Sequence, residues 1–236
     1  MPISLALVTA RVEAIPWWTQ FPARAAASAL RWVPRIPATQ LEQVFPGIDQ
    51  VEVTLKHHVG DRALAHGEAL VLALITALIQ PQRIIEIGTA GGQGTTIMAD
   101  QAPQAKIDTL DLGNEVPSLG QQRGQPPWQD LSTVGAAYRA AGHDERVTQH
   151  FADSAHFDYD CLGAQIDLAF IDGAHTYEYV ASDSRRVLAQ VAHDGVVVWD
   201  DCDFRSPGVS RALVELRAQG RAIYRVVGTR LAVLRG

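Results

Sequence analysis

The chain has 236 residues, 47% of them hydrophobic and 19% charged, which suits one globular domain with a sizeable core. Its formal net charge is -6 and it has no block of lysine or arginine, which argues against nucleic acid as a partner. The longest apolar stretch, residues 69–79, is shorter than the roughly 20 residues of a membrane-spanning helix, so we expect no membrane segment. Two cysteines and the absence of a basic region before the first apolar run favour a cytoplasmic protein.

Residues 1–58 differ from the rest because they are rich in proline and tryptophan. Between Pro22 and Pro34 an alanine-rich stretch predicts one short helix, and the later prolines prevent a longer one. We expect an N-terminal arm that packs on the core, covers a site as a lid, or forms a contact in a homo-oligomer. Residues 59–236 are expected to form the main domain.

From residue 64 onward, predicted helices and strands alternate. The strands are expected at residues 83–88, 106–113, 147–154, 165–173 and 195–201, the helices at 64–79, 95–102, 177–191 and 209–220, and a closing hairpin at 221–227 and 230–235. Continuous apolar strands that alternate with helices indicate a parallel sheet covered on both faces. The sequence therefore predicts a doubly wound, Rossmann-like α/β fold whose last hairpin adds an antiparallel strand. The polar segment 113–135 is a long loop after a strand, where ligand loops sit in such folds.

The segment IIEIGTAGGQGTT, residues 84–96, places a glycine-rich turn after an apolar strand. No lysine follows the glycines, so a triphosphate-binding loop is excluded, and the match to the dinucleotide pattern G-x-G-x-x-G is poor. Glu86 would repel a pyrophosphate but attract an ammonium group, such as that of S-adenosylmethionine (SAM). The alternative is that Glu86 is merely a residue at the end of a strand.

Acidic residues at the ends of the next two strands extend this interpretation. Asp111 can accept hydrogen bonds from ribose hydroxyls, a role that also occurs in dinucleotide-binding proteins. Asp153, followed by Ser154, could read the adenine amino group, although an aspartate and a serine that form a turn or cap a helix are almost equally compatible with this pattern.

The stretches EIGTAGGQGTT, FIDGAHTYEYV and GVVVWDD, together with Asp111, resemble the class I SAM-dependent methyltransferases. Among these, the chain is similar to metal-dependent small-molecule O-methyltransferases of the catechol type and the macrolide sugar type, from about Val59 to the C-terminus. In the catechol type a serine stands at the place of Gly94, so here Thr95 or a backbone N–H must hold the cofactor carboxylate. The resemblance implies cofactor contacts at Glu86, Gly88, Gly92, Gly94, Thr95, Asp111, Asp153, Ser154 and Asp172.

Three further acids follow neighbouring predicted strands. Asp172 ends one strand, and Asp200 and Asp201 end another, so their carboxylates can meet at one edge of the sheet. Clustered carboxylates repel one another unless a cation lies between them, and Arg205 is the nearest basic residue in the sequence. Oxygen ligands suit Mg²⁺, and the resemblance implies that these three acids are the metal ligands. The alternative is that they are solvated loop acids or helix caps.

The resemblance also implies that His175 is the general base, because the family places a lysine or a histidine there. A histidine suits removal of a proton from an activated hydroxyl. We therefore expect a SAM-dependent O-methyltransferase, assisted by Mg²⁺, that acts on a small-molecule hydroxyl acceptor of secondary metabolism: a sugar, a glycosylated metabolite or a phenol. The alternatives are a metal-independent methyltransferase with the same base and a non-catalytic SAM-binding protein.

Overall fold

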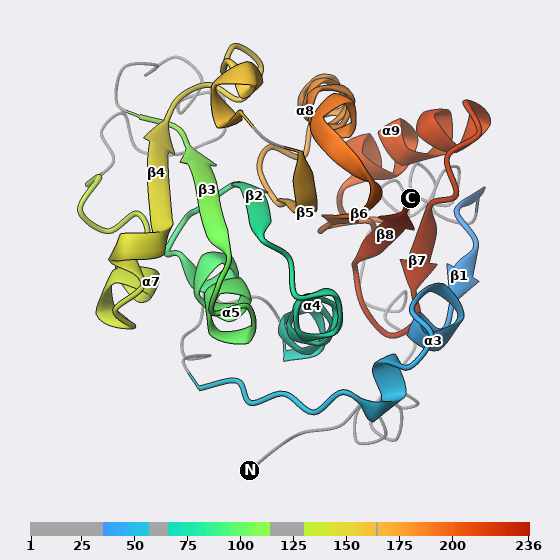
Figure 1. Ribbon diagram of the computed structural model, residues 1–236. Helices are drawn as coiled ribbons and strands as arrows, with labels where there is room; N and C mark the ends of the chain where they lie inside the picture. The colour runs from blue at the N-terminus through green and yellow to red at the C-terminus, as the bar shows by residue number, and fades with distance from the viewer. Residues whose placement is uncertain (1–34, 57–65, 114–129, 164) are drawn as a thin grey trace.

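The computed structural model describes residues 35–56, 66–113, 130–163 and 165–236, and these form one sheet with helices on both faces (Figure 1). The sheet has eight strands in the order β1-β7-β8-β6-β5-β2-β3-β4. β8 is antiparallel to its neighbours β6 and β7, and the other strand pairs are parallel. The predicted fold, including the antiparallel strand from the last hairpin, is confirmed.

The elements lie close to the predicted ranges. The strands are β1 (Ala38–Thr39), β2 (Arg83–Ile87), β3 (Lys106–Asp111), β4 (Val147–Phe151), β5 (Ile166–Ile171), β6 (Val191–Trp199), β7 (Tyr224–Val226) and β8 (Ala232–Arg235). The helices are α3 (Leu41–Val44), α4 (His66–Ile79), α5 (Gln93–Gln101), α7 (Ala136–Ala140), α8 (Tyr177–Gln190) and α9 (Pro207–Ala218), with 3-10 turns η3 (Ile48–Gln50), η4 (Asp144–Arg146) and η5 (Tyr159–Leu162). β6 begins four residues earlier than predicted, at Val191, and its pairing with β5 shifts register between Ile166 and Leu168.

The core consists of two apolar layers, one on each face of the sheet. Alternate strand residues such as Ile84 and Val198 pack with α4 and α5, whereas their neighbours Ile85 and Trp199 belong to the layer under α8 and α9. Figure 1 shows the same division, with α4 and α5 on one side of the strands and α8 and α9 on the other. The indole N–H of Trp199 donates to Ser184 Oγ at 2.9 Å, which ties α8 to the end of β6.

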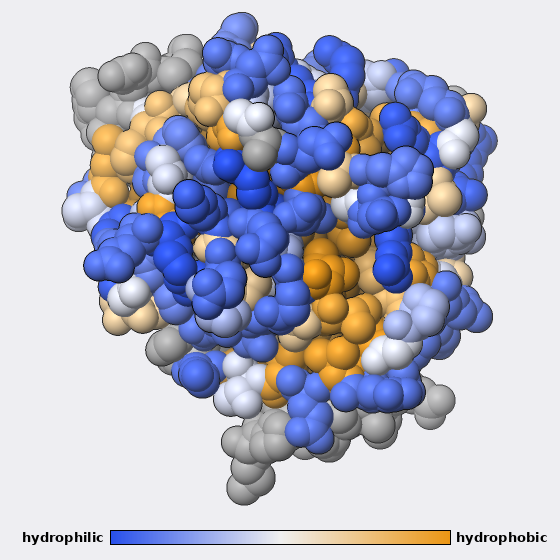
Figure 2. Space-filling view, in the orientation of Figure 1, coloured by the Kyte–Doolittle hydropathy of each residue, from blue (hydrophilic) through white to orange (hydrophobic). Residues whose placement is uncertain are grey.

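The apolar stretch that ends at Ile79 forms α4, a helix of 14 residues that is buried along most of its length. Within the described ranges, no helix is both long and apolar enough to cross a bilayer. Figure 2 shows a largely hydrophilic face whose largest apolar area lies near the position of α4 and α3 in Figure 1, with smaller apolar areas elsewhere. The apolar character of α4 therefore reflects packing inside the protein, as predicted.

The described part of the N-terminal segment belongs to the sheet and the core. β1 pairs in parallel with β7, opposite Arg225 and Val226, a strand that the sequence did not predict. Ile36, Phe45 and Ile48 are fully buried. The expected helix between Pro22 and Pro34 and the loop at residues 114–129 lie outside the described residues, and the division into an arm and a main domain stays a prediction.

Phe45 provides a test of how firmly this segment is packed. We expect Phe45→Ala to lower the free energy of unfolding by about 3–5 kcal/mol, because it removes a fully buried aromatic ring. Urea denaturation with Val227→Ala as the control, whose side chain is 49% exposed, measures the difference. Equal unfolding midpoints for the two variants would contradict the packing described for this segment.

Candidate active site

The loop after β2 is held by close contacts of its glycines. Gly88 has a φ of 103° and Gly92 a φ of 84°, values that side chains rarely permit. A Cβ on Gly88 would lie 2.1 Å from the carbonyl oxygen of Asp172, and one on Gly92 would lie 2.7 Å from Cα of Gly135. The two glycines therefore let the loop pack against the end of β5 and the start of α7.

Glu86 lies beneath this loop, with only 1% of its surface exposed. A Cβ on Gly94, in the first turn of α5, would lie 2.4 Å from Oε1 of Glu86, so the missing side chain makes room for the carboxylate. The hydroxyl of Thr95 donates a hydrogen bond to Oε2 of Glu86. The hydroxyl of Thr95 is thus engaged inside the protein, and a contact of Thr95 or of a backbone N–H of α5 with a ligand carboxylate stays a prediction.

A chain of hydrogen bonds leads from β4 to Glu86. Thr109 Oγ1 donates to Glu86 Oε2 at 2.6 Å, and Thr89 Oγ1 lies 2.7 Å from Thr109 Oγ1. The side-chain amide of Gln149 donates to Thr89 Oγ1 at 3.0 Å. Each hydroxyl has a single proton, so donation runs in one direction, from Gln149 through Thr89 and Thr109 to Glu86. The sequence analysis did not predict this network.

Burial raises the pKa of Glu86 to about 7, although the hydrogen bonds from Thr109 and Thr95 act in the opposite direction. Desolvation disfavours the charged form of a carboxyl group, and here it outweighs the two hydrogen bonds. Glu86 therefore holds the glycine loop and α5 against the sheet. The contact with a ligand ammonium expected from the sequence stays a prediction.

Asp111 lies at the end of β3, next to the glycine loop. Its Oδ2 accepts a hydrogen bond from the backbone N–H of Ala90 at 2.6 Å, and its Oδ1 accepts one from Leu112 at 2.7 Å. These contacts fix the carboxylate at the edge of the sheet, and a carboxylate has lone pairs for further donors such as ribose hydroxyls.

Asp153 and Ser154 follow β4. Oδ1 of Asp153 accepts from the backbone N–H of Ala155 at 3.0 Å, the pattern of an aspartate that forms a turn. Oδ2 of Asp153 is bonded to His156 Nδ1 at 2.9 Å and accepts from the hydroxyl of Tyr179 at 3.2 Å. These contacts favour the turn role that the sequence left open, and adenine recognition by Asp153 and Ser154 stays a prediction.

The acids after β5 and β6 lie together at the carboxyl edge of the sheet. Ile171 and Trp199 are paired in the parallel ladder, so Asp172 and Asp200 leave adjacent strands side by side. Burial, together with the charges of Asp200 and Asp201, raises the pKa of Asp172 well above its usual range. Burial and the charge of Asp201 raise the pKa of Asp200 to about 6.

The cation beside these acids is Arg230, in the turn between β7 and β8, and not Arg205. Nη2 of Arg230 lies 3.2 Å from Oδ2 of Asp200, and Nη1 donates to Oδ1 of Asp201. Arg205 instead pairs with Asp203 at 2.7 Å. Arg230 is 29 residues after Asp201 in the chain, so only the folded hairpin brings it to the acids, and the sequence analysis missed it.

His175 lies in the turn between β5 and α8, with its side chain 52% exposed. Its Nε2 is 2.8 Å from Oδ2 of Asp201. A Cβ on Gly208 would lie 2.4 Å from the carbonyl oxygen of His175, so the start of α9 packs directly against this turn. The hydrogen bond to Asp201 raises the pKa of His175, although its partial burial acts in the opposite direction. For Asp201, burial raises the pKa, but the hydrogen bond from His175 and the nearby positive charges lower it below its usual range.

The Mg²⁺ site that the resemblance implies fits these residues only in part. Ligand atoms of Asp172, His175 and Asp201 all lie within 4.8 Å of one another, close enough to share one ion. Asp200 is not in this group, and its two oxygens accept from the backbone N–H of Asp201 and from Arg230. The expected ligand set of Asp172, Asp200 and Asp201 therefore does not fit as it stands, because a guanidinium already contacts two of the three acids.

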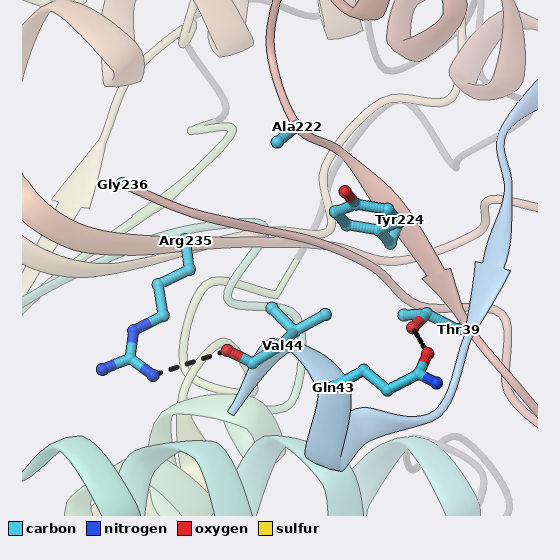
Figure 3. Close-up of a pocket in the computed structure, with 7 residues that line it drawn as sticks. All are labelled: Thr39, Gln43, Val44, Ala222, Tyr224, Arg235 and Gly236. Atoms are coloured by element: carbon cyan, nitrogen blue, oxygen red, sulfur yellow. Dashed lines mark hydrogen bonds between the residues drawn. The ribbon is translucent and has the colours of Figure 1, made fainter. Parts of the chain in front are cut away.

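A cavity of about 350 Å³ lies elsewhere, at the opposite edge of the sheet (Figure 3). Arg235, at its rim, is paired with Val196 in the β6–β8 ladder, whereas the acids follow Trp199 at the other end of β6. Polar groups that line the cavity are bonded to one another. Thr39 donates to Gln43 at 2.5 Å, and Arg235 donates to the carbonyl of Val44 at 3.4 Å. This cavity is separate from the candidate site.

Glu86 should make stability depend on pH. Its pKa is about 7 in the folded protein and 4.5 ordinarily, so the folded state binds this proton more tightly. Stability should therefore fall by about 3 kcal/mol as the pH rises from below 4.5 to above 7. Urea denaturation across this range should show a smaller fall for Glu86→Gln, whose amide oxygen can still accept from Thr95 and Thr109. The same fall in both proteins would show that Glu86 does not cause it.

Comparison with known proteins supports the same fold. A family model described as a methyltransferase domain matches residues 85–202, half of the chain. No curated protein matches the sequence. Among solved structures, the cofactor-bound protein Rv0187 from MTB is 19% identical with a TM-score of 0.56 and covers 91% of this chain and 90% of its own. The O-methyltransferase from Bacillus cereus, in complex with SAH, is 16% identical with a TM-score of 0.53. The match covers 75% of this chain and 84% of the Bacillus cereus chain.

A third similar structure is the O-methyltransferase TomG from Streptomyces achromogenes, involved in tomaymycin synthesis and in complex with SAM. It is 17% identical with a TM-score of 0.51 and covers 92% of this chain and 91% of its own. At these identities the structures show the shared fold, and the family model covers β2 to the acids after β6. The chain belongs to this family of methyltransferase domains, which confirms its resemblance to the class I SAM-dependent methyltransferases.

Proposed function

We propose that this protein transfers the methyl group of SAM to a hydroxyl oxygen of a small molecule, with His175 as the general base. The observation that carries the proposal is the His175–Asp201 pair, 2.8 Å apart, at the same sheet edge as the glycine loop. The half-exposed imidazole is accessible to an acceptor that approaches this edge. The family match supports methyl transfer as the reaction class.

The cofactor would lie along the ends of β2, β3 and β5. SAM, when bound, supplies an electrophilic methyl group on a sulfonium. We infer that its carboxylate lies near the start of α5, at the positive end of the helix dipole, and that the carboxylate of Asp111 binds the ribose. A cationic ligand at this edge would stabilise the ionised form of Asp172, whose pKa is otherwise raised by burial and by the neighbouring acids. Support for this cofactor also comes from the SAH complex of the Bacillus cereus enzyme and the SAM complex of TomG.

The chemistry of the base follows from its hydrogen bond. With Asp201 accepting from Nε2–H of His175, the lone pair of the imidazole is on Nδ1, the atom that can take the acceptor's proton. The carboxylate of Asp201 then stabilises the imidazolium that forms, as in other aspartate–histidine pairs. Asp201 also orients the ring, so the pair supplies both a proton acceptor and its position.

The acceptor that this site suits is a small molecule with a hydroxyl group. The net charge of -6 makes nucleic acid an unfavourable acceptor, and a single histidine base suits a hydroxyl of a sugar, a glycosylated metabolite or a phenol. TomG, which is involved in tomaymycin synthesis, is one example of small-molecule chemistry on this fold.

A second candidate is the same reaction assisted by a divalent cation. It is favoured by the grouping of Asp172, His175 and Asp201 within 4.8 Å. In that case Asp172 and Asp201 would hold the ion, which would make a bound hydroxyl more acidic. It is opposed by the contacts of Arg230 with Asp200 and Asp201.

The role of His175 can be tested by separating binding from turnover. We expect calorimetric titration to show SAM binding by the wild type and by His175→Gln with similar affinity. With catechols and simple glycosides as acceptor probes, His175→Gln should lower kcat by about 10²–10⁴-fold, the usual contribution of a general base.

His193→Gln is the matched control for this experiment, because the side chain of His193 is 96% exposed. Release of SAH from each variant gives the rate. Equal rates for His175→Gln and the control would remove His175 from the mechanism. A wild type that does not bind SAM would overturn the function itself, and binding without turnover on any probe would favour a non-catalytic binding protein.

A further inference from the structure

We propose that the guanidinium of Arg230 is the resident cation of the Asp200–Asp201 pair, in the place where a divalent cation would otherwise be needed. The two carboxylates follow one another in the chain and both are buried, at 4% and 8% exposed. Two such charges are unstable together without a positive partner. Arg230 contacts both, through Nη2 to Asp200 and Nη1 to Asp201, so one side chain bridges the pair.

The hydrogen bonds of the two carboxylates leave no oxygen without a donor. Oδ1 of Asp200 accepts from the backbone N–H of Asp201 at 2.6 Å, and its Oδ2 is paired with Arg230 at 3.2 Å. For Asp201, Oδ1 accepts from Arg230 and Oδ2 is 2.8 Å from His175. Each oxygen keeps a second lone pair, so a metal ion on either residue would have to share an oxygen with one of these donors. For Asp201, the shared oxygen would be the one that faces the positive charge of Arg230 or the one that holds the proposed base His175.

The backbone at Asp201 favours this arrangement. Its φ of 58° is in the left-handed region, which aspartate tolerates better than most residues. This turn brings the N–H of Asp201 onto the carboxylate of Asp200 and leaves both side chains directed at Arg230. The acid pair is therefore shaped for a bidentate, planar cation, which is the geometry of a guanidinium.

Arg230 is itself held in position from two sides. Its backbone N–H and its Nε both contact Oε1 of Glu68 in α4, at 3.0 and 3.4 Å. Its carbonyl oxygen accepts from the backbone N–H of Cys202 at 2.8 Å, directly after the acid pair. Glu68 is 5% exposed, so it is a buried anchor for the guanidinium. A side chain fixed in this way loses little entropy by staying on the acids, and it would not leave them without breaking the bond to Glu68.

The competing arrangement is an ion shared by Asp172, His175 and Asp201. It would use a nitrogen of the proposed base as a ligand, and it would add a second cation to Asp201 while Arg230 stays in contact. Asp172 does remain available, since its carboxylate makes no hydrogen bond with a described residue. Asp172 follows β5, at the proposed cofactor edge, where the sulfonium of SAM would be a positive partner for its carboxylate.

Mn²⁺ binding, followed by electron paramagnetic resonance on the full chain without SAM, tests the proposal. We expect no tight Mn²⁺ site in the wild type. Arg230→Gln should bind one Mn²⁺ at least about tenfold more tightly, because removal of one adjacent positive charge exposes both carboxylates. Asp201→Asn added to Arg230→Gln should abolish the new site. Arg230→Lys keeps the positive charge, so this variant should not gain the Mn²⁺ site.

Arg211→Gln is the matched control, since Arg211 pairs with Glu215 within α9 and with neither acid of the Asp200–Asp201 pair. Thermal unfolding checks that each variant is folded. If Arg230→Gln does not fold, Mn²⁺ binding by the wild type and by Arg230→Lys tests the proposal, and neither should have a tight site. One Mn²⁺ bound by the wild type at micromolar concentration and lost in Asp201→Asn overturns the proposal, and so does equal binding by wild type and Arg230→Gln.

The catalytic meaning of this inference rests on the proposed function, because a resident guanidinium makes the methyl transfer independent of metal. The proposed methyl transfer and the assignment of Arg230 can fail separately. Mn²⁺ binding is measured without cofactor or acceptor, so an inactive protein with the expected Mn²⁺ pattern would refute the methyl transfer and leave the assignment of Arg230 intact. Turnover that is lost with EDTA and restored by Mg²⁺ would support the methyl transfer and refute the assignment.

Discussion

The repulsion among carboxylates at one edge of a parallel sheet is the constraint on which this site depends. Glu86, Asp172, Asp200 and Asp201 lie at the ends of three neighbouring strands, β2, β5 and β6, because parallel strands end on the same side. Three of these acids have hydrogen-bond partners, and the carboxylate of Asp172 makes no hydrogen bond with a described residue. Threonine hydroxyls hold Glu86, Arg230 bridges the pair after β6, and His175 takes the second oxygen of Asp201.

These different compensations divide the edge into two parts. Around Glu86 the contacts are interior, and they fix the glycine loop and the start of α5. Around Asp201 the contacts reach the half-exposed imidazole of His175, and the chain can move a proton there. Asp172 lies between the two parts, where Gly88 packs against its carbonyl oxygen. The glycine loop follows β2 and Asp201 follows β6, so the strand β5 separates them. Such a fixed separation suits a reaction that depends on positioning.

The sequence was sufficient to predict features that depend on local pattern. Apolar strands such as residues 196–199 predicted the parallel sheet, and the acids after them predicted a charged edge. It was insufficient where a partner comes from a distant element. Arg230 reaches the acids only through the β7–β8 turn, and Glu68 pairs with it from within an otherwise apolar helix. The strand β1 has only two residues, too few for a periodic pattern, and it forms because β7 pairs with it.

The short strand β1 has a consequence for association between chains. At the edge of a sheet, unpaired N–H and C=O groups are a template for another strand. Here β7 is covered by β1, through bonds from Arg225 N–H to the carbonyl of Pro37 and from Val227 N–H to that of Thr39. The outer edge of β1 consists of only two residues, and the residue before them is a proline, which lacks an N–H. Edge-to-edge pairing at this side would gain few bonds, so β1 protects the sheet from extension by a second copy.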